Sequence, residues 1–319
     1  MKKFLCFLFV ILIVYACATE SQLEKEIGNI PVEIEIKRFD KEFSEASPSD
    51  LPKLKREYPY LFPEQFPDSV WVAKMNDTLQ IELFDEISKQ YPDFESDTSE
   101  IRSLFQHIKY YFENFEAPKV VTVISDVDYK NRVIYADTLL LLGLDNYLGK
   151  EHRFYGGIQQ YIKNDFEKEQ IEVDIAKTIA TSKIRSPRNR TFLAQMVYYG
   201  KLYYITQLFI PFRESNQIIG YTEEEYNWAK ANENYIWRYF IERELLFSTD
   251  RKLSERFIDP APFSKFYLEL DNESPGRLGR FIGWEIVRSY MENNEVSLQQ
   301  MLNTSAEEIF NNSKYKPEK

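Results

Sequence analysis

The run VVTVIS, within residues 119–126, places the strongest constraint on the fold of this chain. A continuous β-branched run of this kind is typical of a strand buried on both faces, which needs a covering layer on each side. Two further strand-like segments follow at 132–135 and 138–142, and residues 32–36 alternate with a period of two. These patterns predict a small sheet in the N-terminal half, flanked by helices.

Most of the remaining chain has helical periodicity. Apolar residues make up 44% of the sequence, which is ample for a large packed core. We find no internal repeat and no low-complexity segment, and we therefore expect a single α+β domain over residues 32–319 that is mainly helical. The expected helices span 50–58, 69–90, 99–115, 154–166, 171–184, 191–210, 222–247 and 275–293, with two short ones after Ser297 and Ser305.

The N-terminus has the pattern of a lipoprotein leader. Two lysines precede an apolar run at 4–16, which is too short for a bilayer that needs about 20 residues and fits a secretory signal. The tripeptide VYA before Cys17 resembles a lipobox, and the only other cysteine, Cys6, lies inside the leader. We expect residues 1–16 to be a lipoprotein signal peptide and 17–31 to be a lipid anchor on Cys17 with a tether. An ordinary signal peptide with a chance cysteine is the alternative.

This leader predicts a cell-envelope protein whose acyl chains hold it on a membrane that faces the periplasm or the cell surface. The formal net charge is −11, and basic residues are interspersed with acidic ones. Such a balance repels polyanions, so we expect no nucleic-acid partner.

Motifs of metal-dependent catalysis are missing from the sequence. The two histidines, His107 and His152, lie far apart, and no HExxH motif occurs. His107 is expected on the exposed flank of its helix. Residues 126–131 begin like a calcium loop but lack its later ligands, so a polar turn between strands is the preferred interpretation. No serine or cysteine nucleophile motif is present either, and we predict no cofactor, no metal and no catalytic residue.

A glycine-rich segment follows the strand-like residues 266–270. Three glycines stand at positions 276, 279 and 283, a spacing that matches neither a dinucleotide fingerprint nor a phosphate-binding loop. Ser274 suits a helix N-cap and Pro275 suits the first helical position. The segment therefore predicts a helix from 275 that offers one smooth face, formed by Gly276, Gly279 and Gly283, to a neighbouring helix.

Two arginines are interleaved with these glycines. Arg277 and Arg280 would lie near the N-terminus of the expected helix, where backbone N–H groups favour anions. Anion contact through these two side chains is the alternative to close helix packing.

Several long blocks of the sequence resemble a known family. The blocks are DYKNRVIYADTLLLLGLDNYLGKEHRFYGG at 128–157, QMVYYGKLYYI at 195–205 and SPGRLGRFIGWEIVRSYM at 274–291, together with the lipobox. They resemble the gliding-motility lipoprotein B family, GldB, of the Bacteroidetes. This resemblance implies a lipid-anchored envelope protein that supports gliding motility, with partners in the gliding machinery and the protein secretion machinery coupled to it.

The family is in turn similar to a group of zinc metallopeptidases of gluzincin-like layout. In that resemblance Lys177, Thr178 and Thr181 would stand where HExxH places its two histidines and glutamate, and Tyr199 where a later glutamate would stand. It implies a zincin-like scaffold without its metal, a pseudoenzyme. A lysine cation and two threonine hydroxyls would not hold Zn²⁺.

Two other functions stay open on the sequence alone. One is an envelope hydrolase or peptidase with an unrecognised, metal-independent site. The other is a periplasmic ligand-binding lipoprotein that uses an aromatic-rich cleft between its helices.

Overall fold

The computed structural model describes residues 22–187, 189–268 and 271–317. Its strands are β1 (Ile36–Lys37), β2 (Lys119–Val123), β3 (Val133–Ala136) and β4 (Leu139–Gly143). The helices before and beside the sheet are α2 (Gln22–Gly28), α3 (Phe39–Ser44), α4 (Leu51–Glu57), α5 (Asp68–Met75), α6 (Thr78–Gln90) and α7 (Glu95–Tyr111). The helices after the sheet are α8 (Gln160–Lys163), α9 (Ile171–Lys183), α10 (Phe192–Phe209), α11 (Ser215–Ile219), α12 (Glu223–Ala231), α13 (Glu233–Glu242), α14 (Lys252–Phe257), α15 (Leu278–Asn293), α16 (Leu298–Asn303) and α17 (Ala306–Ser313).

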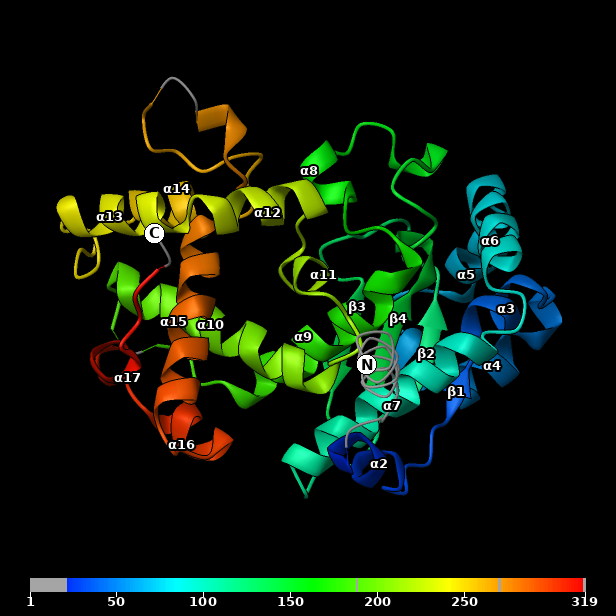
Figure 1. Ribbon diagram of the computed structural model, residues 1–319. Helices are drawn as coiled ribbons and strands as arrows, with labels where there is room; N and C mark the ends of the chain where they lie inside the picture. The colour runs from blue at the N-terminus through cyan, green and yellow to red at the C-terminus, as the bar shows by residue number, and fades with distance from the viewer. Residues whose placement is uncertain (1–21, 188, 269–270, 318–319) are drawn as a thin grey trace, which may run out of the picture.

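The four strands form one mixed sheet in the order β1-β2-β4-β3 (Figure 1). Strand β2 pairs in parallel with both β1 and β4, and β3 and β4 form an antiparallel hairpin. The prediction of a mainly helical α+β fold with a small sheet in the N-terminal half is confirmed.

Strand β2 is buried on both faces, as its β-branched run predicts. Val120, Val121 and Thr122 are each 0% exposed. Because successive side chains of a strand point to opposite faces, Val120 belongs to the main core, whereas Val121 belongs to a second core with Phe43 and Leu54. The main core also draws on α7, α9, α10 and α15, so the sheet separates two hydrophobic cores.

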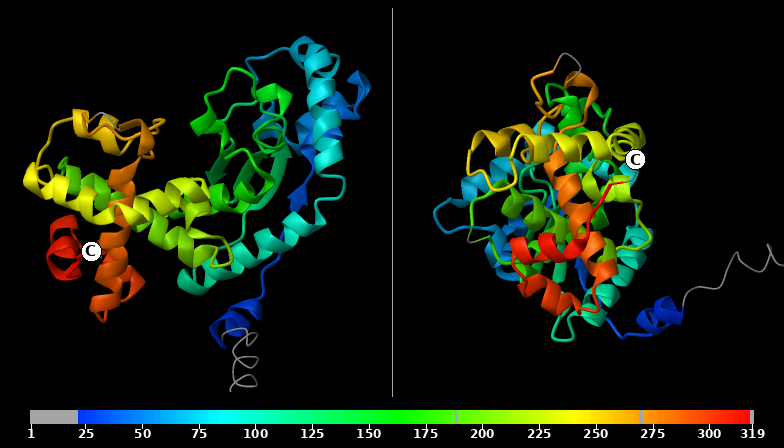
Figure 2. Two further views of the ribbon diagram at one scale, coloured as in Figure 1. Left: turned by 45° about the horizontal axis from the view of Figure 1, so that its top comes forward. Right: turned by 60° about the vertical axis from the view of Figure 1, so that its left-hand side comes forward.

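Helices α10 and α15 form the centre of the helical half. Figure 2 shows, in its left view, α12 to α17 gathered on one side and the sheet with α3 to α7 on the other. The two central helices touch through their backbones: a Cβ added to Gly283 would lie 1.9 Å from the Met196 carbonyl oxygen. A Cβ added to Gly200 would lie 2.1 Å from the carbonyl oxygen of Gly283. Only glycine permits this approach.

Three of the expected helices are interrupted. The helix expected at 69–90 is divided because Asp77 starts a new one, its carboxylate accepting a hydrogen bond from the Gln80 N–H at 3.1 Å. The helix expected at 222–247 changes course at Asn232, whose φ of −103° and ψ of 7° end α12. Within 154–166 only the single turn α8 is an α-helix. In each case a local side-chain or turn conformation overrides the apolar periodicity.

Two expected strands are shorter or missing. Of the alternating segment 32–36, only Ile36 lies in a strand, which it forms with Lys37. Residues 266–268 form bends rather than a strand, and 269–270 lie outside the described residues. Tyr267 has a φ of +63°, which does not fit an extended strand.

The structure corrects two predictions near the N-terminus. Helix α2 lies within the segment expected to be a tether, and its Ile27 is 1% exposed. It packs on α7, where His107 is 3% exposed instead of facing solvent. His107 lies 2.8 Å from the Ser103 carbonyl oxygen and 3.1 Å from the Glu24 carboxylate. The periodicity of α7 could not reveal α2 as its partner, because the two helices are far apart in the sequence.

Candidate functional site

Helix α9 lies where the sheet meets the helical half, with contacts to β3, α7 and α10. Of its four charged residues, Glu172 and Asp174 are 0% and 8% exposed. Lys177 is half-buried. Charged side chains are seldom buried unless they are paired. The partners of these three residues therefore define the candidate sites.

The Asp174 carboxylate is paired with Arg132, in the loop before β3. Arg132 Nε lies 2.7 Å from Asp174 Oδ2, and the Tyr147 hydroxyl donates to the same oxygen at 2.9 Å. Burial raises the pKa of Asp174, and the Arg132 guanidinium opposes that rise. Both carboxylate oxygens have donors. This pair therefore fastens α9 to the sheet and is not a free acid.

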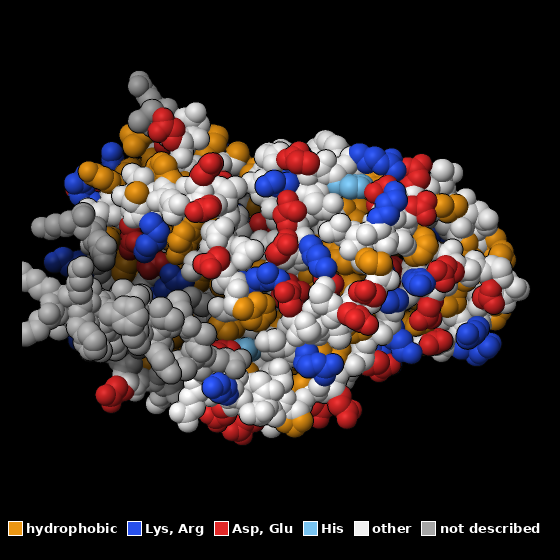
Figure 3. Space-filling model, turned by 45° about the vertical axis from the view of Figure 1, so that its right-hand side comes forward, with side chains coloured by type: hydrophobic (Ala, Val, Ile, Leu, Met, Phe, Trp, Pro, Cys, Tyr) orange, Lys and Arg blue, Asp and Glu red, His pale blue; other side chains and the backbone are white. Residues whose placement is uncertain are grey.

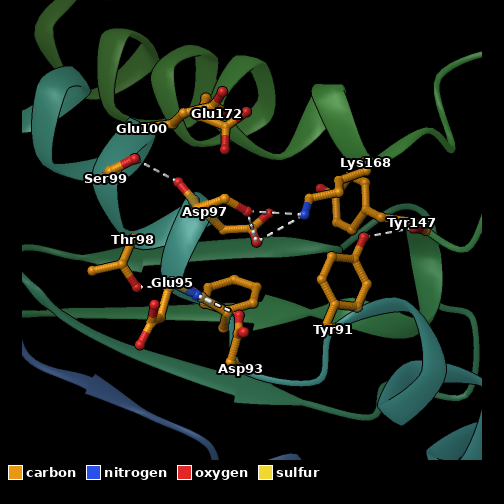
Figure 4. Close-up of polar contacts among 12 residues, drawn as sticks. Tyr91, Asp93, Glu95, Asp97, Thr98, Ser99, Glu100, Tyr147, Lys168 and Glu172 are labelled. Atoms are coloured by element: carbon orange, nitrogen blue, oxygen red, sulfur yellow. Dashed lines mark hydrogen bonds and ion pairs between the residues drawn. The ribbon is translucent and has the colours of Figure 1, made fainter.

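A second set of buried charges joins α7 to α9. Lys168 Nζ lies 3.0 Å from Asp97 Oδ2 and 5.4 Å from the centre of the Tyr91 ring, and Figure 4 shows the three side chains facing one another. Glu172 accepts a hydrogen bond from Arg213 at 2.8 Å, while burial raises its pKa. Asp97 is 2% exposed. Buried and cation-paired carboxylates of this kind hold elements together and are out of reach of a substrate.

The Lys177 side chain belongs to a third group, which we call the cation cluster: Lys177, Arg277 and Arg280 around Tyr203. Lys177 Nζ lies 6.0 Å from the centre of the Tyr203 ring. Arg280 Nη1 lies 3.4 Å from the Tyr203 hydroxyl oxygen. Burial alone would raise the pKa of Tyr203, yet the charges of Arg280, Arg277 and Lys177 lower it below its ordinary value. The cluster therefore places three positive charges near one buried tyrosine.

Aromatic rings hold the two arginines of the cation cluster in place. The Arg280 guanidinium lies 3.8 Å from the centre of the Tyr199 ring and donates from Nε to the Ile258 carbonyl oxygen at 2.5 Å. Arg277 lies 5.3 Å from the centre of the Tyr221 ring. Planar guanidinium groups stack well on aromatic faces. Both cations are thus preorganised.

The start of α15 differs from the prediction. The helix begins at Leu278, not at Pro275, and Arg277 occupies the N-cap with a φ of +61°. Ser274 does not cap it, because the Ser274 hydroxyl donates to the Asp271 carbonyl oxygen at 2.7 Å. The Ser264 hydroxyl instead accepts from the Leu278 N–H at 3.3 Å. The tight turn at 274–277 delays the helix by one turn.

The three glycines of this segment therefore have different neighbours. Gly276 lies in the turn, where an added Cβ would be 2.2 Å from the Ala261 carbonyl oxygen. Gly279 and Gly283 lie in α15. An added Cβ on Gly279 would be 2.9 Å from the Phe257 carbonyl oxygen, while Gly283 faces α10. Gly276 thus packs against a loop, and Gly283 against a helix.

The four positions named from the peptidase resemblance do not form one group in the structure. Lys177 and Tyr199 both reach the cation cluster, from α9 and α10. Thr178 is half-buried, and Thr181 is exposed and donates to the Lys177 carbonyl oxygen at 2.7 Å. Sequence reasoning did not identify Tyr203. The signal was present, because Tyr199 and Tyr203 are four residues apart and so share one helix face.

Two features expected from the sequence, the signal peptide and Cys17, lie outside the described residues. Within the three described ranges, no group of three or more His, Cys, Asp or Glu side chains is placed to hold a metal ion. No helix of the same ranges is long and apolar enough to cross a bilayer.

An aromatic pocket opens between α13 and the loop before α15. It encloses about 300 Å³. Tyr235 and Tyr239 of α13 line it, together with Phe266 and Leu268 of the loop. Figure 3 shows a different face, formed by the N-terminal half, where acidic and basic side chains are intermingled.

Comparisons with known proteins give one match. A family model described as "Gliding motility protein GldB" matches residues 20–317. No curated protein matches the chain, and no solved structure does. The match covers both cores, the sheet and the cation cluster.

Proposed function

Because the chain belongs to the family of the gliding motility protein GldB, we propose that it is a lipid-anchored, non-catalytic scaffold of the cell envelope. Its role is to support gliding motility and the protein secretion machinery coupled to it. The acyl chains on Cys17 hold it on a membrane that faces the periplasm or the cell surface, and its body contacts protein partners of these machineries.

The observation that carries the non-catalytic part is the positive potential between α9 and α10. In the peptidase resemblance this is where a zinc ion would be bound, yet Lys177 Nζ, Arg277 and Arg280 surround Tyr203 there. Zinc requires deprotonated or neutral N, S and O ligands, and three cations repel it. The same place suits an anion rather than a catalytic metal.

The position of α2 supports a scaffold held near the membrane. Cys17 lies a few residues before Gln22, the first residue of that helix. Because α2 packs on α7 through the buried Ile27, a short link would join the lipid anchor to a rigid part of the body. A partner in the same membrane would then meet a fixed orientation of the protein.

The test is complementation of a gliding strain that lacks this gene. Cys17→Ser removes the thiol that is acylated, so we expect loss of the protein from the detergent phase and loss of gliding. Cys6→Ser is the matched control, since it changes the other cysteine of the chain and should leave both readouts intact. A Cys17→Ser protein that still partitions as a lipoprotein would sink the anchor assignment.

The ligand-binding alternative has one observation in its favour. The aromatic pocket beside α13 is about 300 Å³, at the lower end of the range of small-molecule sites. A ligand there would be mostly apolar, since Tyr235, Tyr239 and Phe266 supply much of its lining.

A further inference from the structure

Three cationic side chains from two distant parts of the chain lie around Tyr203, with Arg280 at its hydroxyl and Lys177 over its ring. Lys177 comes from α9, and Arg277 and Arg280 come from the start of α15. Their charges together lower the pKa of Tyr203 despite the opposing effect of its burial. All three charges therefore act on this one buried side chain.

In the part of the chain that the structure describes, none of the cations of this cluster forms a direct ion pair. Within the described ranges, no carboxylate lies within ion-pair distance of Lys177, Arg277 or Arg280. Arg280 donates to a backbone carbonyl oxygen, at Ile258, and Arg277 donates to another at 2.5 Å. Asp165 and Glu225 act on Arg277, and Asp174 acts on Lys177, without a direct ion pair. A cation without a close anionic partner is costly for a side chain half-removed from water.

The neighbouring carboxylates are engaged elsewhere. Asp174 is bound to Arg132 at 2.7 Å. Asp165 lies against Gly220, the residue whose carbonyl oxygen accepts from Arg277, but forms no ion pair with that arginine in the described structure. Glu225 accepts from the Thr222 N–H at 2.8 Å as part of a capping box. None of the three forms an ion pair with a cation of the cluster in the described structure.

The Tyr203 hydroxyl is itself incompletely bonded. The side chain is 2% exposed, and its oxygen accepts one long hydrogen bond, at 3.4 Å, from Arg280. Across the described chain, no acceptor is placed for its O–H proton. A buried hydroxyl without an acceptor is unfavourable and points to a missing partner. An oxyanion between the cations would accept this proton.

The geometry also suits a ligand with several oxygens. The guanidinium of Arg280 is held on the Tyr199 ring and that of Arg277 near the Tyr221 ring, so neither must be ordered on binding. Helix α15 begins at Leu278, beside both arginines, and its N-terminus adds a partial positive charge.

We propose that the cation cluster binds a phosphate group, held by Lys177, Arg277 and Arg280 and by the Tyr203 hydroxyl. A phosphate carries close to two negative charges and three strong acceptor oxygens. Arginine forks match those oxygens in pairs. A single carboxylate would balance only part of the charge of three cations. The ligand is either free phosphate or a phosphate monoester.

Isothermal titration of the purified full-length protein in detergent with inorganic phosphate tests the proposal. We expect saturable binding tighter than about 1 mM. Lys177→Gln should weaken it at least about tenfold, because this side chain donates no hydrogen bond within the described protein and can be lost without unfolding. Tyr203→Phe should weaken binding in the same direction, since it removes only the hydroxyl.

The matched control is Lys183→Gln. Lys183 lies on the same helix, with its Nζ 5.6 Å from the centre of the Phe112 ring, away from the cluster. It should leave the affinity within a factor of about two. Thermal melts confirm that each variant is folded.

Three results would overturn the proposal: no saturable binding by the wild type, an equal loss in Lys183→Gln, or acetate binding as tightly as phosphate. Glycerol phosphate distinguishes the sources. Binding of glycerol phosphate tighter than that of inorganic phosphate identifies a monoester as the ligand, whereas inorganic phosphate binding tighter identifies the free ion. The assay does not depend on Cys17, so its failure is distinct from failure of the anchor.

Discussion

Lys201 shows how a single charge is used structurally in this protein. It lies on α10, is 8% exposed, and donates from Nζ to the carbonyl oxygens of Leu302 and Thr304 at 3.0 and 2.7 Å. These two carbonyl groups belong to the end of α16 and the turn after it. Burial lowers the pKa of Lys201 to about 8. The residue therefore ties α10 to the C-terminal helices at the cost of burying a charge.

The lowered pKa of Lys201 predicts a pH dependence of stability. Between pH 8 and its ordinary pKa of 10.5, the unfolded chain binds more protons at this residue than the folded one. Stability should therefore rise with pH across this window, by about 2 kcal/mol from this group. Lys201→Met should lack that contribution. Urea unfolding of both proteins from pH 7 to 10 measures this contribution. If the free energy of unfolding of the wild type, relative to that of Lys201→Met, stays constant or falls as the pH rises, the lowered pKa of Lys201 is refuted.

At the residue scale, sequence reasoning failed where a distant element decides. The anion contact expected at Arg277 and Arg280 stays a prediction. His107 was placed on an exposed flank, because nothing in α7 indicates that α2 covers it. Tyr203 was passed over, because a tyrosine in an aromatic-rich helix resembles any core residue until Lys177 is brought beside it.

At the scale of elements, α10 and α15 depend on glycine at their crossing. Helix α10 was predicted to within a residue or two at each end, and α15 was predicted to begin three residues early. The early start at Pro275 was wrong because the 274–277 turn satisfies its polar groups through Ser264 and Asp271. Such loop contacts lie outside the helix and cannot be derived from helix periodicity.

The close crossing of α10 and α15 predicts that one added methyl group strongly lowers the stability of the protein. Gly283→Ala should destabilise the protein by about 3 kcal/mol, because the new Cβ would meet the Met196 backbone and no rotamer change can relieve it. Gly28→Ala is the control, since nothing lies within 4 Å of its added Cβ at the end of α2. Its effect should stay within about 1 kcal/mol. An equal loss in the free energy of unfolding for both variants, measured by chemical denaturation, would show that α10 and α15 can move apart to accept the methyl group.

At the scale of the whole molecule, the fold class followed from one strand. The VVTVIS run requires cover on both faces, and the structure provides two cores that share β2. This sharing agrees with the single domain expected over residues 32–319, which stays a prediction. The sequence did not predict that α9, α10 and α15 come together around Tyr203, because the residues involved are far apart along the chain.

The central claim, a scaffold and not an enzyme, is tested most directly by the zinc content and peptidase activity of the purified protein. A bound metal would stabilise the fold by about 2.7 kcal/mol at a hundredfold excess over its Kd, which a thermal melt detects easily. We predict no stoichiometric zinc, no chelator-dependent change in Tm and no peptide cleavage, because cations lie at the place that the peptidase resemblance assigns to a zinc ion. One zinc per chain by elemental analysis, with cleavage that a chelator abolishes, would contradict the account.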